Sequence, residues 1–150
     1  MGYTQYWGQS RAFTSSEWET VKTLAEELTS YCEVPLDDLE ISDNHIVFNG
    51  VEEDGHESFV LSIVPELQPW QDEHFDFCKT ARKPYDVPVA LLLLAIHHFV
   101  PNVLAISSDG QWNEDTSKED WGGGWVHIRE QFEDFFDETP EKPEGIRLAT

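Results

Sequence analysis

The sequence contains little positive charge and few cysteines. Its 150 residues include 9 Lys and Arg against 30 Asp and Glu, which gives a formal net charge of −21. Such a charge repels nucleic acid and anionic membrane surfaces, so we expect neither as a direct partner. The 2 cysteines, Cys32 and Cys78, are too few for a disulfide framework. This scarcity favours a reducing compartment, and we expect the protein in the cytoplasm.

Membrane and leader signals are also lacking. The apolar run VPVALLLLAI is too short to span a bilayer and is followed by His97 and His98, so it predicts a buried helix. The start MGYTQYWGQS has neither the basic nor the apolar region of a signal peptide. The chain is nevertheless 39% hydrophobic and 13% aromatic, which is rich enough to bury the core of a single domain.

Motifs for metals, cofactors and catalysis are missing. The sequence has no Cys-x-x-Cys, no His-Glu-x-x-His and no glycine-rich phosphate loop, so we expect no metal and no cofactor. It also lacks a nucleophile motif such as Gly-x-Ser-x-Gly. The sequence leaves enzymatic activity open but favours a protein without it. In an enzyme, His97, His98 or Asp109 would act as the acid or base.

Local patterns predict three helices. Thr14 and Glu17 form a candidate capping box before apolar residues at helical spacing, which predicts a helix through Cys32. A second helix is predicted from Val87 to Phe99 with Asp86 as its N-cap. A third is predicted from Trp125 to about Glu138.

Strand patterns complete the predicted fold. Alternation favours a strand at residues 3–7, and VLAISS at residues 103–108 is typical of a buried strand. A hairpin is predicted around VEEDGH, whereas residues 65–74 are predicted as a loop. The order of elements indicates an α+β domain with a small, mostly antiparallel sheet of about four strands and about three helices. We expect one globular domain over residues 1–138 and a loosely held tail over residues 139–150.

Three of the nine cations lie within five residues. Lys79, Arg82 and Lys83 precede the predicted helix at Val87, whose N-terminus offers free N–H groups and the positive end of a dipole. Together these features indicate a site for a phosphate or carboxylate, which Arg82 would grip with two parallel hydrogen bonds. The competing interpretation is that the three cations neutralise nearby carboxylates. Asp86 and Pro88 also weigh against an anion site, because they occupy or remove N–H groups of the first turn.

The C-terminal half is strongly acidic. Segments such as REQFEDFFDETPE alternate acids with aromatics, which places carboxylates along one side of the third predicted helix. A row of this kind resembles the charge pattern of a nucleic-acid backbone. Its candidate partner-binding residues are Glu114, Asp115, Glu119, Asp120, Glu130, Glu133, Asp134 and Asp137.

Three short motifs carry a resemblance. The opening MGYTQYW, the segment FCKTARKPYD and the turn ISSDG together resemble a group of small uncharacterised proteins encoded by phages and prophages. The resemblance implies an accessory protein that acts in the cytoplasm of a bacterial host, with counter-defence as its candidate role. It also favours a site built from these three segments.

Three functions follow from these patterns. The first is a binding protein that holds, and so sequesters, an anionic, phosphate-bearing, nucleotide-like small molecule. Its site would use Lys79, Arg82 and Lys83 for phosphate, Tyr3, Trp7 and Tyr85 as ring surfaces, and Ser108 and Asp109 for hydroxyls. The second is a nucleic-acid mimic that binds a basic host protein through the acidic half. The third is a hydrolase acting on the nucleotide-like ligand.

Overall fold

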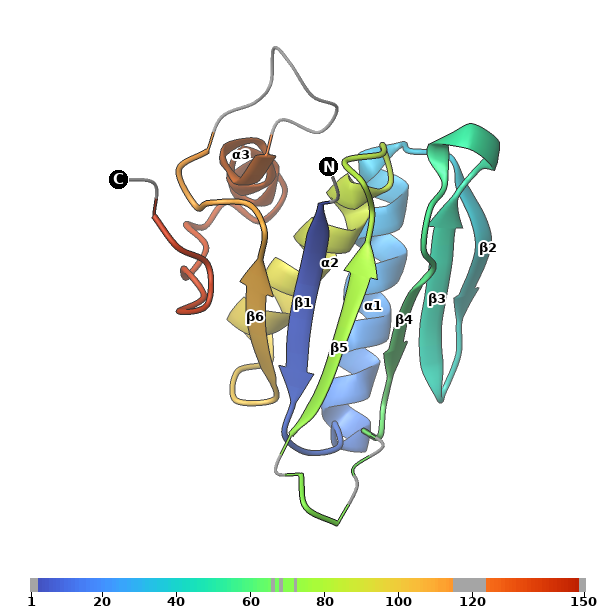
Figure 1. The fold of residues 1–150 in the computed structure, drawn as a ribbon, viewed down its shortest axis with the longest axis vertical. Helices are drawn as coiled ribbons and strands as arrows, with labels where there is room; N and C mark the ends of the chain where they lie inside the picture. Colours follow the sequence, from blue (N-terminus) through green and yellow to red (C-terminus); the bar gives the residue numbers. More distant parts are fainter. Residues whose placement is uncertain (1–2, 66, 68, 72, 115–123, 149–150) are drawn as a thin grey trace.

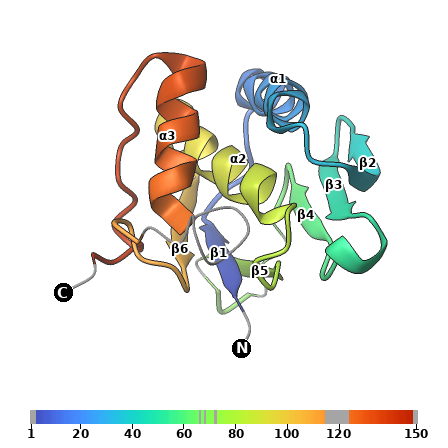
Figure 2. The same cartoon turned by 90° about the horizontal axis from the view of Figure 1, so that it is seen from above.

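Three helices lie on one side of six antiparallel strands in the computed structural model, which describes residues 3–65, 67, 69–71, 73–114 and 124–148 (Figures 1 and 2). The strands form two three-stranded sheets in the orders β5-β1-β6 and β2-β3-β4. The predicted α+β class is therefore confirmed. The described residues form the three helices that were expected, and six strands where about four were expected. The strands are β1 (Thr4–Gln9), β2 (Leu36–Ile41), β3 (His45–Gly50), β4 (Phe59–Ser62), β5 (His74–Lys79) and β6 (Leu104–Ser108). The helices are α1 (Ser15–Cys32), α2 (Asp86–Phe99) and α3 (Gly124–Phe136), with a short 3₁₀ turn η1 (Glu52–Asp54).

Helix α1 begins at the predicted capping box. The Thr14 hydroxyl accepts a hydrogen bond from the Glu17 N–H (3.1 Å), and the Glu17 carboxylate accepts one from the Thr14 N–H (2.9 Å). These two bonds satisfy backbone donors that would otherwise lack partners at the helix start. The helix buries Trp18, Val21 and Leu28 against the core, as the periodicity predicts.

Helix α2 is the centre of the core. Every residue from Asp86 to Ile96 is buried, and the helix lies between α1 and α3, behind sheet β5-β1-β6 (Figure 2). A helix that is apolar on all sides needs neighbours on all sides, which explains the run of four leucines. Its first residue is Asp86, and its N-cap is Tyr85 with no side-chain capping bond, so the prediction of Asp86 as N-cap is wrong.

Two strands were absent from the sequence-based prediction. Strand β5 exposes Phe75 and Phe77 while the polar side chains of His74 and Asp76 are partly buried, the reverse of the usual pattern for a half-buried strand. Strand β2 is acidic, largely exposed and interrupted between Asp37 and Glu40, so it resembles a surface loop in sequence. Charged residues of this kind are common on edge strands, where they discourage pairing with other chains.

The C-terminal segment is packed onto the domain, contrary to the predicted loose tail. Ile146 is fully buried, and Gly145 forms a parallel β-bridge with Ser107. The Trp112 N–H donates to the Arg147 carbonyl at 2.7 Å. The domain therefore includes residues beyond 138, because an apolar residue far along the chain completes its core.

Candidate functional site

The three segments of the predicted anion site meet at one end of sheet β5-β1-β6. Strand β1 lies between the other two strands, with Thr4 opposite Lys79 on β5 and Gln5 opposite Ser108 on β6. Beyond the strands, the Thr80 and Ala81 N–H groups both donate to the Tyr3 carbonyl, each at 3.1 Å. The three segments are therefore neighbours in space, which the sequence alone left open.

Arg82 is engaged within the protein. Its guanidinium carbon lies 3.9 Å from the centre of the Tyr3 ring, and its Nη2 donates to Glu114 Oε1 at 2.8 Å. The other Glu114 oxygen accepts from the Gln111 N–H at 3.1 Å, which fixes the carboxylate in place. Ala81 and Arg82 both have positive φ values, of 54° and 57°, so the loop is wound to bring the guanidinium to these partners. Arg82 therefore neutralises a carboxylate of the same chain, as the competing interpretation of the basic cluster predicts.

The three rings assigned to stacking are enclosed. Tyr3, Trp7 and Tyr85 are each at most 3% exposed. The Tyr85 hydroxyl donates to the Glu57 carbonyl at 2.5 Å, and the Tyr3 ring lies under Arg82. A nucleobase needs an open ring face to stack on. These rings offer none, and we therefore correct this part of the predicted site.

The N-terminus of α2 has no donors left for an anion. The N–H groups of Asp86 and Val87 donate to the carbonyls of Lys83 and Pro84, and Pro88 has no N–H. The Asp86 carboxylate is buried and accepts from Gln5 Nε2 (3.0 Å) and Thr80 Oγ1 (2.6 Å). Burial raises the pKa of Asp86, an effect opposed by these two hydrogen bonds. The helix end therefore contributes no backbone N–H to an anion site, contrary to the prediction.

Ser108 and Asp109 also serve the fold. Ser108 Oγ accepts from the Gly110 N–H and from Trp125 Nε1, both at 3.0 Å. Asp109 accepts from the Thr4 N–H at 3.0 Å and from the Tyr6 hydroxyl at 2.9 Å. The hydrogen bond from Tyr6 to Asp109 raises the pKa of the Tyr6 hydroxyl. Of the predicted site, Lys79 and Lys83 keep side chains at least partly at the surface, and no ion pair of either is present within the described part of the chain.

The acidic residues of α3, and Asp137 just after it, are at the surface. Glu130, Glu133, Asp134 and Asp137 are exposed, and Asp134 accepts a 2.6 Å hydrogen bond from the Tyr31 hydroxyl. Glu114 is instead committed to Arg82. Asp115, Glu119 and Asp120 lie outside the described residues.

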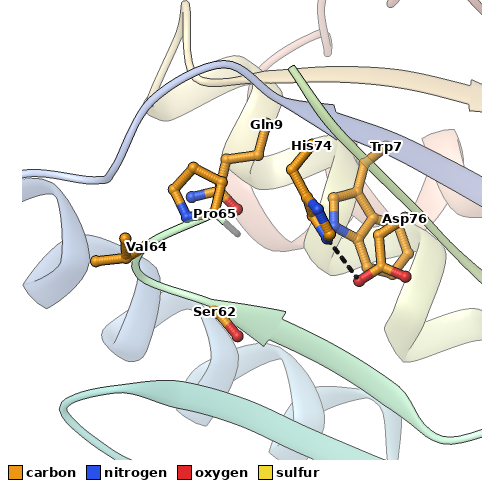
Figure 3. A pocket seen from close by; sticks show the side chains of 7 residues that line it. All are labelled: Trp7, Gln9, Ser62, Val64, Pro65, His74 and Asp76. Atoms are coloured by element: carbon orange, nitrogen blue, oxygen red, sulfur yellow. Dashed lines mark ion pairs between the residues drawn. The ribbon is translucent and has the colours of Figure 1, made fainter. Parts of the chain in front are cut away.

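A small cavity opens between β4 and β5 on the inner side of the sheet (Figure 3). It measures about 240 Å³ and is lined by Trp7, His74 and Asp76 among others. The His74 and Asp76 side chains approach each other at 3.7 Å, and the Trp7 indole lies beside them. Trp7 therefore points away from Lys79 and Arg82, toward a different part of the molecule.

Sequence reasoning missed an aromatic row on the outer face of the sheet. We call Phe75, Tyr6 and Phe77 the aromatic row; the Tyr6 ring lies between the two Phe rings, with centroid separations of 5.8 and 6.5 Å. Phe75 is 58% exposed and Phe77 is 45% exposed. The alternation of His74 to Lys79 was the available signal, and it becomes informative only once the segment is known to pair with β1.

A cleft adjoins the Phe75 end of this row. It measures about 510 Å³ and lies between β6 and the C-terminal segment. Its lining includes the carboxylate residues Glu73, Glu141 and Glu144, together with Lys142, His97 and Ser107. Burial lowers the pKa of His97, so its ring is uncharged at neutral pH and the cleft keeps a negative balance.

Groups that could perform catalysis are separated or protected. His97 lies beside the start of β6, whereas Asp109 follows the end of that strand. Burial raises the pKa of Cys78 to about 12, so its thiol is protonated and a poor nucleophile. Within residues 3–114 and 124–148, apart from the gaps given above, no cluster of three or more His, Cys, Asp or Glu side chains is arranged to hold a metal ion. The helices of this same part of the chain include none with the length and apolar character needed to cross a bilayer.

Comparisons with models of protein families, with curated proteins and with solved structures found no match to this chain. Its function is therefore argued from the geometry and chemistry of its own residues.

Proposed function

We propose that this protein is a non-enzymatic binding protein that captures a basic protein of the bacterial cytoplasm by imitating nucleic acid. The observation that supports it is the distribution of charge. Arg11, Lys22 and Arg82 each form an ion pair with a carboxylate of the same chain, at 2.7–2.8 Å. These three cations are thus neutralised by carboxylates of the same chain, while other carboxylates face solvent and attract positive partners.

Helix α3 presents part of this charge in a row. Glu130 and Glu133 are exposed on α3, three residues apart, and the exposed Asp137 directly follows its end. Residues three apart lie on one side of a helix, so Glu130 and Glu133 are about 4.5 Å apart along its axis. A row of negative charges at this interval suits a surface that normally binds a phosphate backbone.

The test is capture of a basic protein from a bacterial lysate by the immobilised protein. We expect retention at about 0.1 M salt and release at about 0.5 M, because screening shortens the range of exposed charges. Changing Glu130, Glu133 and Asp137 together to Lys should abolish retention. Asp134 is left unchanged because it binds Tyr31.

A matched control reverses the same number of charges elsewhere. Glu52, Glu53 and Asp54 are exposed on η1, and changing all three to Lys alters the net charge equally. We expect this variant to retain the partner. Equal loss in both variants would mean attraction to net charge alone. The captured protein, once purified, should also lose its affinity for DNA when the native protein is added, and unchanged DNA binding would contradict the mimicry.

A nucleotide-like ligand remains a second candidate because of one observation. The three segments meet in one place, and Lys79 and Lys83 lie there near the surface. A bound phosphate compound should raise the free energy of unfolding by about 2.7 kcal/mol at a hundredfold excess over its dissociation constant. Thermal melts against mono-, di- and cyclic nucleotides would reveal this, and the rise should disappear in a Lys79→Ala, Lys83→Ala variant.

A further inference from the structure

The outer face of sheet β5-β1-β6 is open and aromatic. The helices lie behind this sheet in the view of Figure 1. Phe75 and Phe77 are exposed and alternate along β5 with partly buried or buried residues, so they project from the face opposite the helices. Strand register explains the row: Tyr6 is directly opposite Phe77, and Gly8 is opposite Phe75. Phe75 and Phe77 are both about half exposed and both contact the Tyr6 ring, and contiguous exposed apolar groups of this kind mark interaction surfaces.

A carboxylate is built into this face. The absence of a side chain at Gly8 leaves a recess in which the Glu73 carboxylate lies, since a Cβ at Gly8 would come within 2.3 Å of that carboxyl carbon. Glu73 and Phe75 both line the cleft beside β6, and Glu141 and Glu144 face them from the C-terminal segment. The Phe75 end of the row therefore offers a ring together with three carboxylates against one lysine, Lys142. A guanidinium is the group that satisfies both, because it stacks on rings and pairs with carboxylates.

Backbone N–H groups along the β5 edge of the sheet are already bonded, which disfavours the addition of another strand there. Strand β5 is the edge strand of its sheet. The Phe77 N–H donates to its neighbour's carboxylate, Asp76 Oδ1, at 2.8 Å, and the Lys79 N–H donates to Glu57 Oε1 at 2.9 Å. A partner that reaches this region is therefore received on the face of the sheet rather than by backbone pairing along β5.

The negative charge of this face determines which kind of partner it can bind. A second copy of the chain would bring another formal charge of −21 to a surface that carries Glu73 and Asp109 against Lys79 of β5. Nucleic acid is repelled for the same reason. A segment that carries arginines is attracted by the carboxylates and stacks on the row.

We infer that the open face of sheet β5-β1-β6 is the docking surface for the basic partner, and that it receives an arginine-bearing segment with one guanidinium between Phe75 and the carboxylates of the cleft. This inference rests on the proposed function and names a second contact surface for the same partner, in addition to the acidic residues of α3. The side chains that carry it are the aromatic row and Glu73.

The experiment uses a fluorescent peptide in which arginine alternates with valine, and measures its affinity by anisotropy. We expect the Phe75→Ala, Phe77→Ala variant to bind about tenfold more weakly, because two stacking surfaces are lost. Glu73→Gln should weaken binding about fivefold, and Gly8→Ala should do the same by displacing the Glu73 carboxylate. A peptide with lysine in place of arginine should bind about threefold more weakly to the native protein.

Two matched controls separate docking from general attraction. Trp70→Ala removes an aromatic ring that is 79% exposed and not part of the row, and Glu133→Gln removes one charge on α3. Each should change the peptide affinity by less than about twofold. Equal weakening by Glu133→Gln and Glu73→Gln, with no effect of the Phe variant, would overturn the inference.

Capture of the basic protein from the lysate distinguishes this inference from the function on which it rests. If the Phe75→Ala, Phe77→Ala variant captures the partner as well as the native protein does, the docking surface is wrong and the proposed function stands. If the native protein captures nothing, both fail. Self-association in sedimentation that the Phe variant abolishes would assign the face to a second copy and would also overturn the inference.

Discussion

At the scale of single residues, Arg82 is predicted to matter for stability. Its guanidinium contacts the Tyr3 ring at 3.9 Å and Glu114 at 2.8 Å, and its side chain is only partly exposed. Arg82→Ala should lower the free energy of unfolding by about 1–2 kcal/mol, because it removes a cation–π contact and leaves a carboxylate without its partner. Urea denaturation measures this directly.

Two companion variants test the origin of that loss. Lys83→Ala removes a neighbouring cation and should cost no more than about 0.5 kcal/mol. In a double-mutant cycle with Glu114→Ala, the effects of the two single changes should not add, because each breaks the same pair. Additive effects would show that Arg82 acts independently of Glu114.

The same residues show what sequence could and could not predict about the site. The clustering of Lys79, Arg82 and Lys83 was visible in the sequence, whereas only the structure shows that the three segments lie side by side. The burial of Tyr3 and Tyr85 was not visible, because it depends on the strand order β5-β1-β6 and on a loop with two positive φ values. A ring's neighbours across a sheet are non-local, and local patterns do not specify them.

At the scale of elements, the start of α1 is predicted to be sensitive to acid. Hydrogen bonds from Arg11, and next from the Thr14 backbone, lower the pKa of Glu17 from 4.5 to about 2. The ionised carboxylate therefore stabilises the folded state above pH 4.5, and this contribution is lost as the pH falls toward 2. Glu17→Gln should be less stable than the native protein at pH 7, and the difference should shrink below pH 4.5.

Thr14→Ala is the matched control for this helix start. It removes the other half of the capping box and should cost about 1 kcal/mol. Because a hydroxyl does not titrate in this range, most of that cost should be the same at pH 7 and at pH 4.5. A Glu17→Gln difference that stays constant down to pH 2 would contradict the role of the charge. Chemical denaturation at several pH values is the measurement.

The C-terminal segment gives a second prediction at this scale. Ile146 is fully buried, whereas Leu148, two residues on, is 58% exposed. Ile146→Ala should cost about 2–4 kcal/mol through lost burial and an unfilled cavity. Leu148→Ala should cost less than about 0.5 kcal/mol. Similar small effects of both changes, measured by thermal or urea unfolding, would restore the description of residues 139–150 as a loose tail.

Elements whose patterns are local were predictable. The capping box of α1, the apolar run of α2 and the hairpin β3–β4 were each recognised from a few neighbouring residues. Strand β5 was missed because its apolar residues face outward, and β2 because its acids and its irregular pairing hide the alternation. The inverted pattern of β5 is itself informative, since it produces the aromatic row that we assign to docking.

At the scale of the whole molecule, the charge of −21 is predicted to limit stability at low ionic strength. Carboxylates crowd the surface and repel one another more strongly in the compact state than in the unfolded chain. Raising the salt from about 0.01 M to about 0.3 M shortens the screening length severalfold and should raise the melting temperature. A variant with Glu52, Glu53 and Asp54 changed to Lys raises the formal net charge by six and should depend less on salt. If native protein and variant respond equally, the salt acts through some property other than self-repulsion, and the long-range attraction on which the capture of a basic partner depends would lose its basis.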